Sequence, residues 1–561
     1  MSYKRLGEIL TDAGVISQEQ LSQALKLQKD TKKRLGTVLM EHGFITEADL
    51  IRTLHLQLGI DFVDLSRENL DRRMVELLPG SIAKKYKVIP LRLEGAGLVT
   101  AMEDPLDFMA VEAVRTAARR KVIPVLATRE GIRRAYNLLY EAQGAQKAIE
   151  QMEVLEYGED RGEEPGTREQ GQKNQGPIVS LVDSILERAI SERASDIHIE
   201  PGQKAVQVRI RVDGRLVKMM EIPKRLQQPV LARLKIMGDM DVVERRVPQD
   251  GRGVFRTEGR EVDLRFSVLP AIFGENLVIR LLYRREEMLS REGIGLEGEN
   301  ERRFQRLLEN NSGVILIAGP TGSGKSSTMY TMLGELQREE LHLVLLEDPV
   351  EYKMEGITQV QINEKSGMSF SRALRSVLRQ DPDIIGIGEI RDQETAEIAM
   401  RAAMTGHLVI STIHTEDAVS ALDRLRNMGV ESYLIAGALR GVLSQRLVRK
   451  LCPSCRRETK PEERQLDLAG IPKDTDWKFY KGEGCPVCLG SGFWGRTGVF
   501  EILIIDRRIR DCIAEECPRT ALRQAVKASG FVPMMKSGGR LAREGVTSLE
   551  ELCRVISIPD L

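Results

Sequence analysis

The sequence predicts a multidomain α/β protein organised around one phosphate-binding loop, and three observations carry that prediction. The apolar run at residues 314–318, Val-Ile-Leu-Ile-Ala, is typical of a short buried strand, and residues 327–337 are compatible with a helix. Between them stands the pattern Gly-x-x-x-x-Gly-Lys-Ser, which binds phosphate when a strand precedes it and a helix follows. At 561 residues, the chain is long enough for roughly three to five domains.

The loop can bind a nucleoside triphosphate through both backbone and side chains. Its glycines let successive N–H groups point at phosphate oxygens, and the N-terminus of the following helix adds positive potential. Lys325 can reach the outer phosphates, and the hydroxyl of Ser326 can hold Mg²⁺. The alternative is a glycine-rich turn without a ligand, which the complete pattern disfavours. The predicted nucleotide-binding residues are Gly319, Pro320, Thr321, Gly322, Ser323, Gly324, Lys325, Ser326, Ser327 and Asp348.

The N-terminus contains an internal repeat. Residues 5–28 and 34–57 are two copies of 24 residues, separated by residues 29–33 and identical at ten positions. Ser17 and Thr46 are candidate helix N-caps, and apolar residues follow each of them at helical spacing. Each copy is therefore predicted to be a short helical hairpin.

Two interpretations of the repeat stay open. A duplicated packing unit explains the many shared apolar positions, but Arg and Gln also recur at the two ends of each copy. An arginine side chain can stack on a purine or form two hydrogen bonds with a guanine edge. The Arg-Leu-Gly start, the final Gln and the five-residue spacer resemble the tandem cyclic-di-GMP-binding motif of some secretion and pilus ATPases. That resemblance implies a cyclic di-GMP site formed by Arg5, Leu6, Gly7, Gln28, Arg34, Leu35, Gly36 and Gln57.

The next two segments differ sharply in composition. Residues 61–140 alternate short apolar runs with helical stretches, which predicts a small α/β domain that docks a partner. Residues 141–176 hold nine acidic and four basic residues, six Gln and six Gly. Such a composition buries too little apolar surface to order itself, so this segment is predicted to be a flexible linker.

A second N-terminal domain is predicted to begin near Pro177. Residues 208–212 alternate with period two and end at Asp213-Gly214, a hairpin signal. Residues 263–268 and 277–281 alternate in the same way and place arginines on one face of the predicted sheet. These arginines are either solvated surface charge or, beside a nucleotide-binding core, arginine fingers that contact the γ-phosphate.

Two carboxylates and a histidine follow the later strands of the core. Glu347 comes directly after an apolar strand and is the candidate to polarise the attacking water. Glu389 closes the next apolar strand, in the position that usually lies on the Mg²⁺ side. His414 follows a further strand and either reads the presence of the γ-phosphate or is structural.

The motifs of this core resemble those of secretion-superfamily ATPases, and more narrowly the motors of type II secretion and type IV pilus assembly. The phosphate loop, aspartate box, acidic Mg²⁺ motif and histidine box read GPTGSGKSST, LEDPVE, RQDPDIIGIGEIRD and GHLVISTIHTEDA. The segments SDIHIEP, RIRVDG, VPQDGR, DLRFSVLP and GENLVIRLL match the second N-terminal domain of that family. The resemblance covers nearly all of the chain outside the linker, with one departure at Glu416, where relatives usually carry Asn.

This resemblance implies the finer fold class and the assembly. The chain is expected to have a RecA-like phosphate-loop ATPase core, preceded by a PAS-like α+β domain and an N-terminal helical and α/β regulatory domain. The family forms homo-hexameric rings, and by that analogy Arg265, Arg280 and Arg211 would reach bound nucleotide.

Four of the seven cysteines form two Cys-x-x-Cys pairs, which predicts a zinc module. Cys452 with Cys455 and Cys485 with Cys488 are separated by 29 residues. Two such pairs can present four thiolates tetrahedrally to Zn²⁺ and leave no position for water, so the site should be structural. A redox pair would not need the second Cys-x-x-Cys. Cys512, Cys517 and Cys553 are expected to be reduced thiols.

Composition limits the partners and the location. Lys plus Arg and Asp plus Glu are both 83, so zero net charge argues against a protein that mainly coats nucleic acid. No apolar run approaches bilayer length, and the first residues are amphipathic rather than a signal peptide. We therefore predict a cytoplasmic protein, recruited to the inner face of the membrane only through partners. The family resemblance implies that the zinc module contacts an inner-membrane platform protein.

The leading functional prediction is an ATP hydrolase that drives pilin or pseudopilin assembly, regulated by cyclic di-GMP. Type IV pilus extension is favoured over type II secretion, and a retraction motor is disfavoured because that branch lacks the N-terminal region and the cysteine module. A nucleic-acid motor and a nucleotide-gated adaptor without turnover are the alternatives from other classes. The predicted domains are 1–60 (tandem repeat), 61–140 (α/β), 141–176 (linker), 177–290 (second N-terminal domain), 291–450 (core), 451–493 (zinc module) and 494–561 (helical cap).

Overall fold

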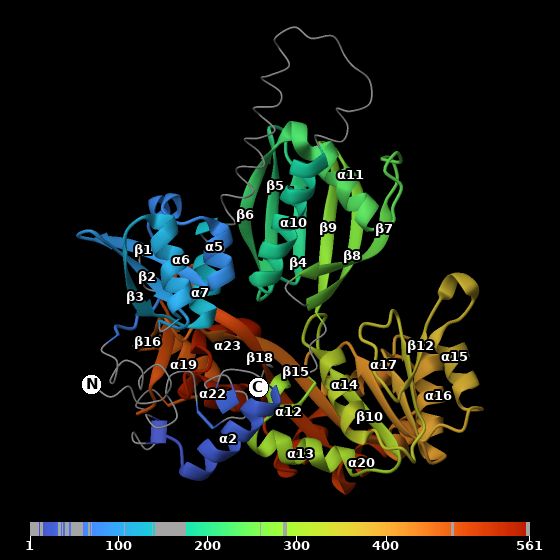
Figure 1. Ribbon diagram of the computed structural model, residues 1–561. Helices are drawn as coiled ribbons and strands as arrows, with labels where there is room; N and C mark the ends of the chain where they lie inside the picture. Colours follow the sequence, from blue (N-terminus) through green and yellow to red (C-terminus); the bar gives the residue numbers. More distant parts are fainter. Residues whose placement is uncertain are drawn as a thin grey trace. The chain divides into compact units, whose positions relative to one another are not determined.

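The computed structural model divides into two compact units, residues 1–257 with 264–281 and residues 258–263 with 282–561 (Figure 1). The residues that it describes are 10–11, 15–31, 35, 38–39, 44–45, 60–65, 68, 70–105, 107–136, 139–140, 175–257, 260–283, 289–472 and 476–556. Within these residues, no helix is long and apolar enough to cross a bilayer.

The described residues of the N-terminal repeat share one backbone feature between the two copies. Helix α2 (Gln18–Thr31) begins after Ser17, which exchanges hydrogen bonds with Gln20 at 2.8 and 3.2 Å, as the predicted N-cap requires. The N–H groups of Val15 and Phe44, 29 residues apart, donate to the carbonyls of Leu10 and Leu39 at 3.0 and 2.9 Å. The second predicted N-cap, Thr46, lies outside the described residues. Two apolar positions that the copies share contribute to one small core, which includes Leu10, Ile16, Leu39 and Ile45.

The following segment forms a three-stranded sheet in the order β1-β2-β3. Strand β2 pairs antiparallel with β1 across a short turn and parallel with β3 through a crossover that contains helix α6. The apolar runs at residues 88–91, 98–101 and 122–126, which alternate with the helical stretches, are confirmed as strands. The elements are η1 (Arg72–Glu76), α5 (Gly80–Tyr86), β1 (Val88–Glu94), β2 (Gly97–Met102), α6 (Phe108–Ala118), β3 (Lys121–Leu126) and α7 (Arg129–Tyr136).

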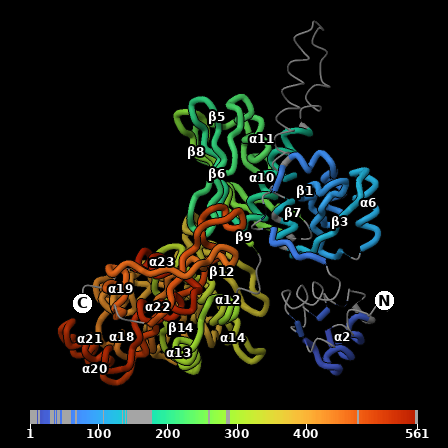
Figure 2. Tube along the Cα trace, turned by 90° about the vertical axis from the view of Figure 1, so that its left-hand side faces the viewer, coloured from blue at the N-terminus to red at the C-terminus, as the bar shows by residue number. Residues whose placement is uncertain are grey.

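A six-stranded sheet follows, in the order β6-β5-β4-β9-β8-β7. Helices α10 and α11 lie on one of its faces in both views (Figures 1 and 2). The predicted hairpin is confirmed, because Asp213 and Gly214 have φ of 47° and 83° and join two directly paired residues, Val212 and Arg215. The elements are α10 (Gln175–Ser191), β4 (Asp196–Pro201), β5 (Ala205–Val212), β6 (Arg215–Pro223), η3 (Lys224–Leu226), α11 (Gln227–Met237), β7 (Gln249–Thr257), β8 (Arg260–Ala271) and β9 (Gly274–Tyr283).

The predicted linker lies outside the described residues except for its last two, which belong to α10. That helix begins at Gln175, two residues before the predicted domain start. Helix α10 is stabilised from its first turn by an apolar face, which begins at Ile178 and continues through Leu181, Val182 and Ile185, all of which are buried.

The second unit is built on a seven-stranded sheet in the order β12-β11-β13-β14-β10-β15-β18. Successive residues of strand β10 point to opposite faces of the sheet: Val314 and Leu316 belong to one core cluster, Ile315 and Ile317 to another. Strand neighbours from β12 to β15 run parallel, as expected of a sheet covered by helices on both faces. The strands are β10 (Gly313–Ala318), β11 (Leu343–Glu347), β12 (Thr358–Gln361), β13 (Ile384–Ile387), β14 (Leu408–Ile413), β15 (Leu439–Leu451) and β18 (Phe493–Ile504).

One part of this sheet comes from beyond the predicted core. Strand β18, which was expected to open the C-terminal helical cap, pairs antiparallel with β15 from Gly441 to Leu451. The four-cysteine segment is therefore the connection between two neighbouring strands. The remaining elements are α12 (Arg291–Ile294), α13 (Gly298–Leu308), α14 (Lys325–Leu336), η5 (Glu364–Ser366), α15 (Phe370–Val377), α16 (Gln393–Met404), α17 (Ser420–Asn427), α18 (Ser432–Ala438), β16 (Arg456–Thr459), α19 (Glu463–Ala469), β17 (Phe479–Gly482), η6 (Pro486–Cys488), α20 (Arg507–Ala514), α21 (Arg519–Ala528), α22 (Met534–Arg543) and α23 (Leu549–Val555).

A buried ion pair ties this sheet to the last helix. The Arg449 guanidinium lies 2.6 Å from a carboxylate oxygen of Glu551, whose side chain is fully buried. The same guanidinium lies 3.9 Å from the ring centroid of Phe493. Burial opposes the charge of Glu551, but the hydrogen bonds from Arg449 and Arg554 outweigh it and lower its pKa to about 2. Removing one partner of such a pair is costly, because it leaves a buried charge uncompensated.

The expectation of reduced thiols is wrong for one pair of cysteines. Cys512 and Cys517 are joined by a disulfide, whereas Cys553 is free. The sequence separation of five residues gave no sign of this pairing, which depends on the turn that brings the N–H of Cys517 to the carbonyl of Cys512 at 3.0 Å.

Candidate nucleotide site and four-cysteine centre

The phosphate loop joins β10 to α14, as predicted. Gly324 caps the helix with a φ of 92°, and Gly322 has a φ of 78° with open space where a side chain would begin. A Cβ on Gly319 would come within 2.7 Å of the backbone oxygen of Gln445. The loop therefore requires glycine both for its backbone angles and for its close approach to β15.

Gln445 on β15 contacts the start of the helix that follows this loop. Its side-chain oxygen accepts a hydrogen bond of 2.6 Å from the hydroxyl of Thr328, and both side chains are buried. Thr328 belongs to the first turn of α14, so this bond fixes the helix N-terminus against the neighbouring strand. The sequence analysis missed Gln445, because no local pattern marks a partner 117 residues away along the chain.

Lys325 is buried, and its ammonium group donates to two neutral carbonyls, those of Gly319 at 2.9 Å and Pro320 at 3.0 Å. Burial lowers the pKa of Lys325, the Glu389 carboxylate opposes that shift, and Arg446 adds to it. Ser323 is also buried, and its hydroxyl has no hydrogen-bond partner within the described residues. A buried cation, an unpaired hydroxyl and a helix N-terminus together fit a phosphate group.

The remaining loop residues border the solvent. Thr321, Gly322 and Ser326 are exposed, so their backbone and hydroxyl groups are open to a ligand, and Ser327 is half-buried. Because Ser326 is the second residue of α14, its hydroxyl lies beside the ammonium-bearing Lys325 at the start of the helix. This position fits the predicted Mg²⁺ ligand.

Glu347, the last residue of β11, is buried, with 3% of its surface exposed. One carboxylate oxygen accepts a hydrogen bond from the hydroxyl of Tyr330, and the other accepts one of 2.9 Å from the side-chain amide of Gln359. Burial raises the pKa of Glu347, and these two hydrogen bonds oppose the shift without cancelling it. Asp348, the next residue, is exposed.

Glu389 follows β13 and has cationic or ionisable partners. Its two oxygens contact the Arg391 guanidinium and, at 3.2 Å, the Nε2 atom of His414. Burial alone would raise the pKa of Glu389, but the hydrogen bond and charge of Arg391, together with His414, outweigh it and lower the pKa. The structure therefore brings together the two residues, Glu389 and His414, that the sequence placed after separate strands.

The two carboxylates stand at the same edge of the sheet. Strands β11 and β13 are parallel neighbours, with Leu346 paired to Ile387. Side chains at the carboxyl ends of such strands project into the crevice where ligands bind in open α/β sheets. The phosphate loop leaves the sheet at this same edge, because β10 runs parallel to β14 and β14 to β13.

The three predicted arginine fingers lie on the six-stranded sheet of the first unit. Asp196 on β4 pairs in register with Arg211 on one side and Arg280 on the other, and its carboxylate lies 3.6 and 3.1 Å from their guanidinium groups. Arg265 and Arg280 line an open cleft of about 590 Å³, together with Arg252, which the sequence analysis missed. One aspartate therefore orients two of the three predicted arginines.

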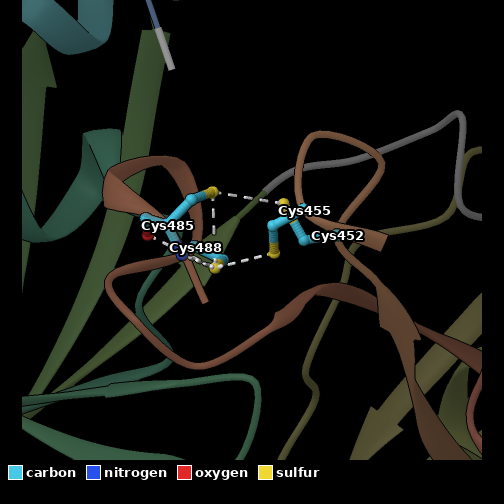
Figure 3. Close-up of side chains that lie close together, drawn as sticks. All are labelled: Cys452, Cys455, Cys485 and Cys488. Atoms are coloured by element: carbon cyan, nitrogen blue, oxygen red, sulfur yellow. Dashed lines mark hydrogen bonds between the residues drawn. The ribbon is translucent and has the colours of Figure 1, made fainter. Parts of the chain in front are cut away.

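The four predicted zinc ligands converge in one cluster, from the turns that follow β15 and precede β18 (Figure 3). Their sulfur atoms all lie within 4.8 Å of one another, and three of the separations are 3.8, 3.8 and 3.7 Å. An ion bound about 2.3 Å from four tetrahedral sulfurs would hold them about 3.8 Å apart, so the cluster has the dimensions of a zinc–thiolate site.

Backbone groups complete this centre. The N–H groups of Cys485 and Gly492 each donate to the sulfur of Cys488 at 3.2 Å. Burial raises the pKa of Cys485 and of Cys455, so these thiols depend on a cation for ionisation. Four soft ligands with no carboxylate or histidine among them favour zinc in a structural role.

The predicted cyclic di-GMP residues lie mostly outside the described residues. Gln28 is half-buried on α2, and Leu35 packs against the small core of the repeat. The other predicted residues, whose structure is not described, are Arg5, Leu6, Gly7, Arg34, Gly36 and Gln57.

Most of the chain matches the models of two known protein families. Residues 171–554 match the family described as Type II/IV secretion system protein, and residues 58–146 match the MshEN domain. The first match contains the phosphate loop, both carboxylates, the three arginines and all four clustered cysteines. The second match begins directly after the tandem repeat.

Three curated relatives illustrate the similarity. The Type IV pilus assembly ATPase PilB of Myxococcus xanthus is 38% identical over 98% of this chain and 98% of its own length. The protein of the same name from Thermus thermophilus is 40% identical over 88% of this chain, which spans only 56% of that relative. The Type II secretion system ATPase E of Vibrio cholerae is 43% identical over 68% of this chain and 76% of its own length.

Proposed function

This chain belongs to the family of type II/IV secretion system proteins, and on that premise we propose that it hydrolyses ATP to power a type IV pilus assembly machine. The observation that carries the proposal is the convergence of the phosphate loop, Glu347 and Glu389 at one edge of the core sheet. A nucleotide-gated adaptor without turnover would not need this complete set.

Each residue of the site has a proposed task. Lys325 exchanges its carbonyl partners for the outer phosphates of ATP, whose charge compensates its buried ammonium group. Ser326 and Glu389 would hold Mg²⁺, which neutralises charge on the phosphates when it is bound. Glu347 takes a proton from the attacking water, the water oxygen bonds to the γ-phosphorus, and ADP leaves. His414, bonded to Glu389, responds to the γ-phosphate.

The experiment that tests hydrolysis is a phosphate-release assay on the purified chain with ATP and Mg²⁺. Lys325→Ala should reduce turnover at least about a hundredfold, because it removes the main cation from the loop. Lys365→Ala, which removes an exposed lysine of the same unit, is the matched control. Absence of turnover in the unaltered chain would favour the adaptor, and strong stimulation by DNA would favour a nucleic-acid motor.

Pilus assembly is the favoured process, and type II secretion is the second candidate. The pilus ATPase of Myxococcus xanthus aligns with 98% of this chain, whereas the secretion ATPase of Vibrio cholerae aligns with 68%. We propose a homo-hexamer in the cytoplasm that reaches the membrane through an inner-membrane platform protein, with Arg265, Arg280 and Arg211 contacting bound nucleotide. Deletion in the source organism should abolish surface pili, and retention of secreted proteins instead would favour the second candidate.

The four-cysteine cluster is proposed to hold a structural zinc ion. One zinc per chain is expected by metal analysis of the purified protein. Cys452→Ser with Cys485→Ser should abolish it and lower the thermal stability, whereas Cys553→Ser, outside the cluster, should leave the zinc content unchanged. Full zinc content in the double variant would contradict this site.

The tandem repeat is proposed to bind cyclic di-GMP as a regulatory ligand. Calorimetric titration should show binding that Arg5→Ala/Arg34→Ala removes. Lys4→Ala/Lys33→Ala is the matched control, because it also deletes two positive charges, from the residue directly before each copy. Equal loss in both variants would indicate a charge effect, and no binding by the unaltered chain would reduce the repeat to a duplicated packing unit.

A further inference from the structure

Glu347 does not stand alone at the end of its strand. The hydroxyl of Tyr330 on α14 and the side-chain amide of Gln359 on β12 each donate one hydrogen bond to it, one to each carboxylate oxygen. Tyr330 and Glu347 are both buried, and Gln359 is half-buried. The backbone N–H of Glu351 also donates to Glu347, while the negative charge of the Glu351 side chain opposes ionisation. A carboxylate has about four acceptor positions, so about one remains for water after these three bonds are made.

A buried carboxylate needs such donors if it is to act as a base. Burial penalises the ionised form and favours a proton that would disable the base, whereas hydrogen bonds to the ionised form counteract that penalty. Burial, and then the charge of Glu347, raise the pKa of Tyr330 well above its usual range, so its hydroxyl stays protonated. Tyr330 is therefore a permanent donor to Glu347.

The position of Tyr330 on α14 links the base to the nucleotide loop. Tyr330 lies four residues after Ser326, so it is one helical turn from the start of the helix that Lys325 opens. Gln359 lies on β12, the parallel neighbour of β11. One donor therefore belongs to the phosphate-binding helix and the other to the sheet, and together they restrain both oxygens of the carboxylate.

We propose that Tyr330 is a positioning residue for ATP hydrolysis, whose hydroxyl keeps Glu347 ionised and oriented relative to the phosphate loop, with Gln359 as its counterpart. The inference rests on the proposed role of Glu347 as the base. In the step concerned, a proton passes from the attacking water to Glu347, the water oxygen bonds to the γ-phosphorus, and the bond to ADP breaks. Tyr330 neither gains nor loses a proton.

A purely structural role is the alternative, because the ring of Tyr330 also packs. It belongs to the core cluster beneath the sheet and lies 6.2 Å from the ring of Tyr352. Tyr330→Phe separates the two roles, since it keeps the ring and removes only the hydroxyl. Tyr352→Phe, which removes a hydroxyl from the adjacent ring, is the matched control.

The expected result for Tyr330→Phe is a fall in kcat of about 10- to 100-fold, the range for losing a hydrogen bond to a charged group. The KM for ATP and the melting temperature should stay close to those of the unaltered chain. The acidic limb of the kcat profile should move to higher pH, because the ionised base has lost a donor. Gln359→Glu keeps an acceptor for the N–H of Met354 but places a negative charge beside Glu347, so it should move the same limb further.

The decisive control is the same change in a Glu347→Gln background. If Tyr330 acts through Glu347, Tyr330→Phe has no further effect on the residual turnover there. An equal fall in both backgrounds, or an unmoved pH profile, overturns the inference and leaves Glu347 as the base. Full turnover by Glu347→Gln itself would instead overturn the proposed role of Glu347. Should Tyr330→Phe fail to fold, the pH profile of Gln359→Glu tests whether the groups that contact Glu347 set the acidic limb of kcat. An unmoved limb in that variant overturns the inference.

Discussion

Two carboxylates at the ends of neighbouring parallel strands have opposite environments. Glu347 after β11 is bound by a tyrosine hydroxyl and a glutamine amide, both neutral, and its pKa is raised. Glu389 after β13 is bound by Arg391 and His414, and its pKa is lowered. Glu347 is buried whereas Glu389 is half-buried, and the two also differ in the charge of their partners, so burial and partner charge together make the difference.

The contrast separates two chemical tasks. A group with a raised pKa has a higher affinity for a proton, which suits a base, whereas a group held ionised by cations can exchange one of them for a metal ion. The sequence shows only an acidic residue after each strand. The division into base and metal ligand follows from the partners, and the experiments below test it.

The largest effect is expected for Glu347→Gln. This change should reduce kcat by about 10²- to 10⁴-fold, the range for removing a general base. ATP binding should persist, because Lys325 and the loop are untouched. Steady-state hydrolysis and calorimetric ATP titration measure the two quantities, and a variant that binds ATP poorly would show that Glu347 acts in binding instead.

A smaller loss, with a different signature, is expected for Glu389→Gln. Removing one charged metal ligand should weaken the response to Mg²⁺ by about 10- to 100-fold, and excess Mg²⁺ or Mn²⁺ should restore part of the activity. Titrating hydrolysis with each metal tests this. If excess metal restored hydrolysis in Glu347→Gln, or failed to restore it in Glu389→Gln, the assignment of Glu347 as the base and Glu389 as the metal ligand would be contradicted.

The acidic pH dependence of turnover should report Glu347. The ionised carboxylate is the active form, and its pKa lies above the usual 4.5, so kcat should fall as the pH drops through that raised value. Below it, the loss should approach about tenfold per pH unit. A kcat profile of the unaltered chain that stays flat down to pH 4.5 would show that no raised carboxyl group takes part.

The smallest effect is expected for Arg391→Ala. Its side chain is 59% exposed, so its ion pair with Glu389 contributes little to stability. Since the guanidinium competes with a metal ion for the same carboxylate, the Mg²⁺ concentration for half-maximal hydrolysis should fall by up to about fivefold. Arg401→Ala, an exposed arginine paired with Glu397, is the control, and a rise in the Mg²⁺ requirement would mean that Arg391 orients Glu389 rather than competes for it.

The sequence by itself determined the features that depend on local spacing. The phosphate loop, the acidic ends of two strands, the Asp213-Gly214 hairpin and the two Cys-x-x-Cys turns are each complete within a short segment, so their residue types and intervals identify them. The repeat was visible for the same reason, and its N-cap at Ser17 is confirmed.

Only the tertiary structure decided which partners these residues meet. Thr328 and Gln445 are 117 residues apart, Glu347 and Tyr330 are 17, and the strand that completes the core sheet, β18, begins beyond the cysteine module. Such contacts form because sheet pairing and helix packing bring distant segments together, and no local pattern encodes that. The partners in turn set burial and charge, so the chemical difference between Glu347 and Glu389 exists only in the folded chain.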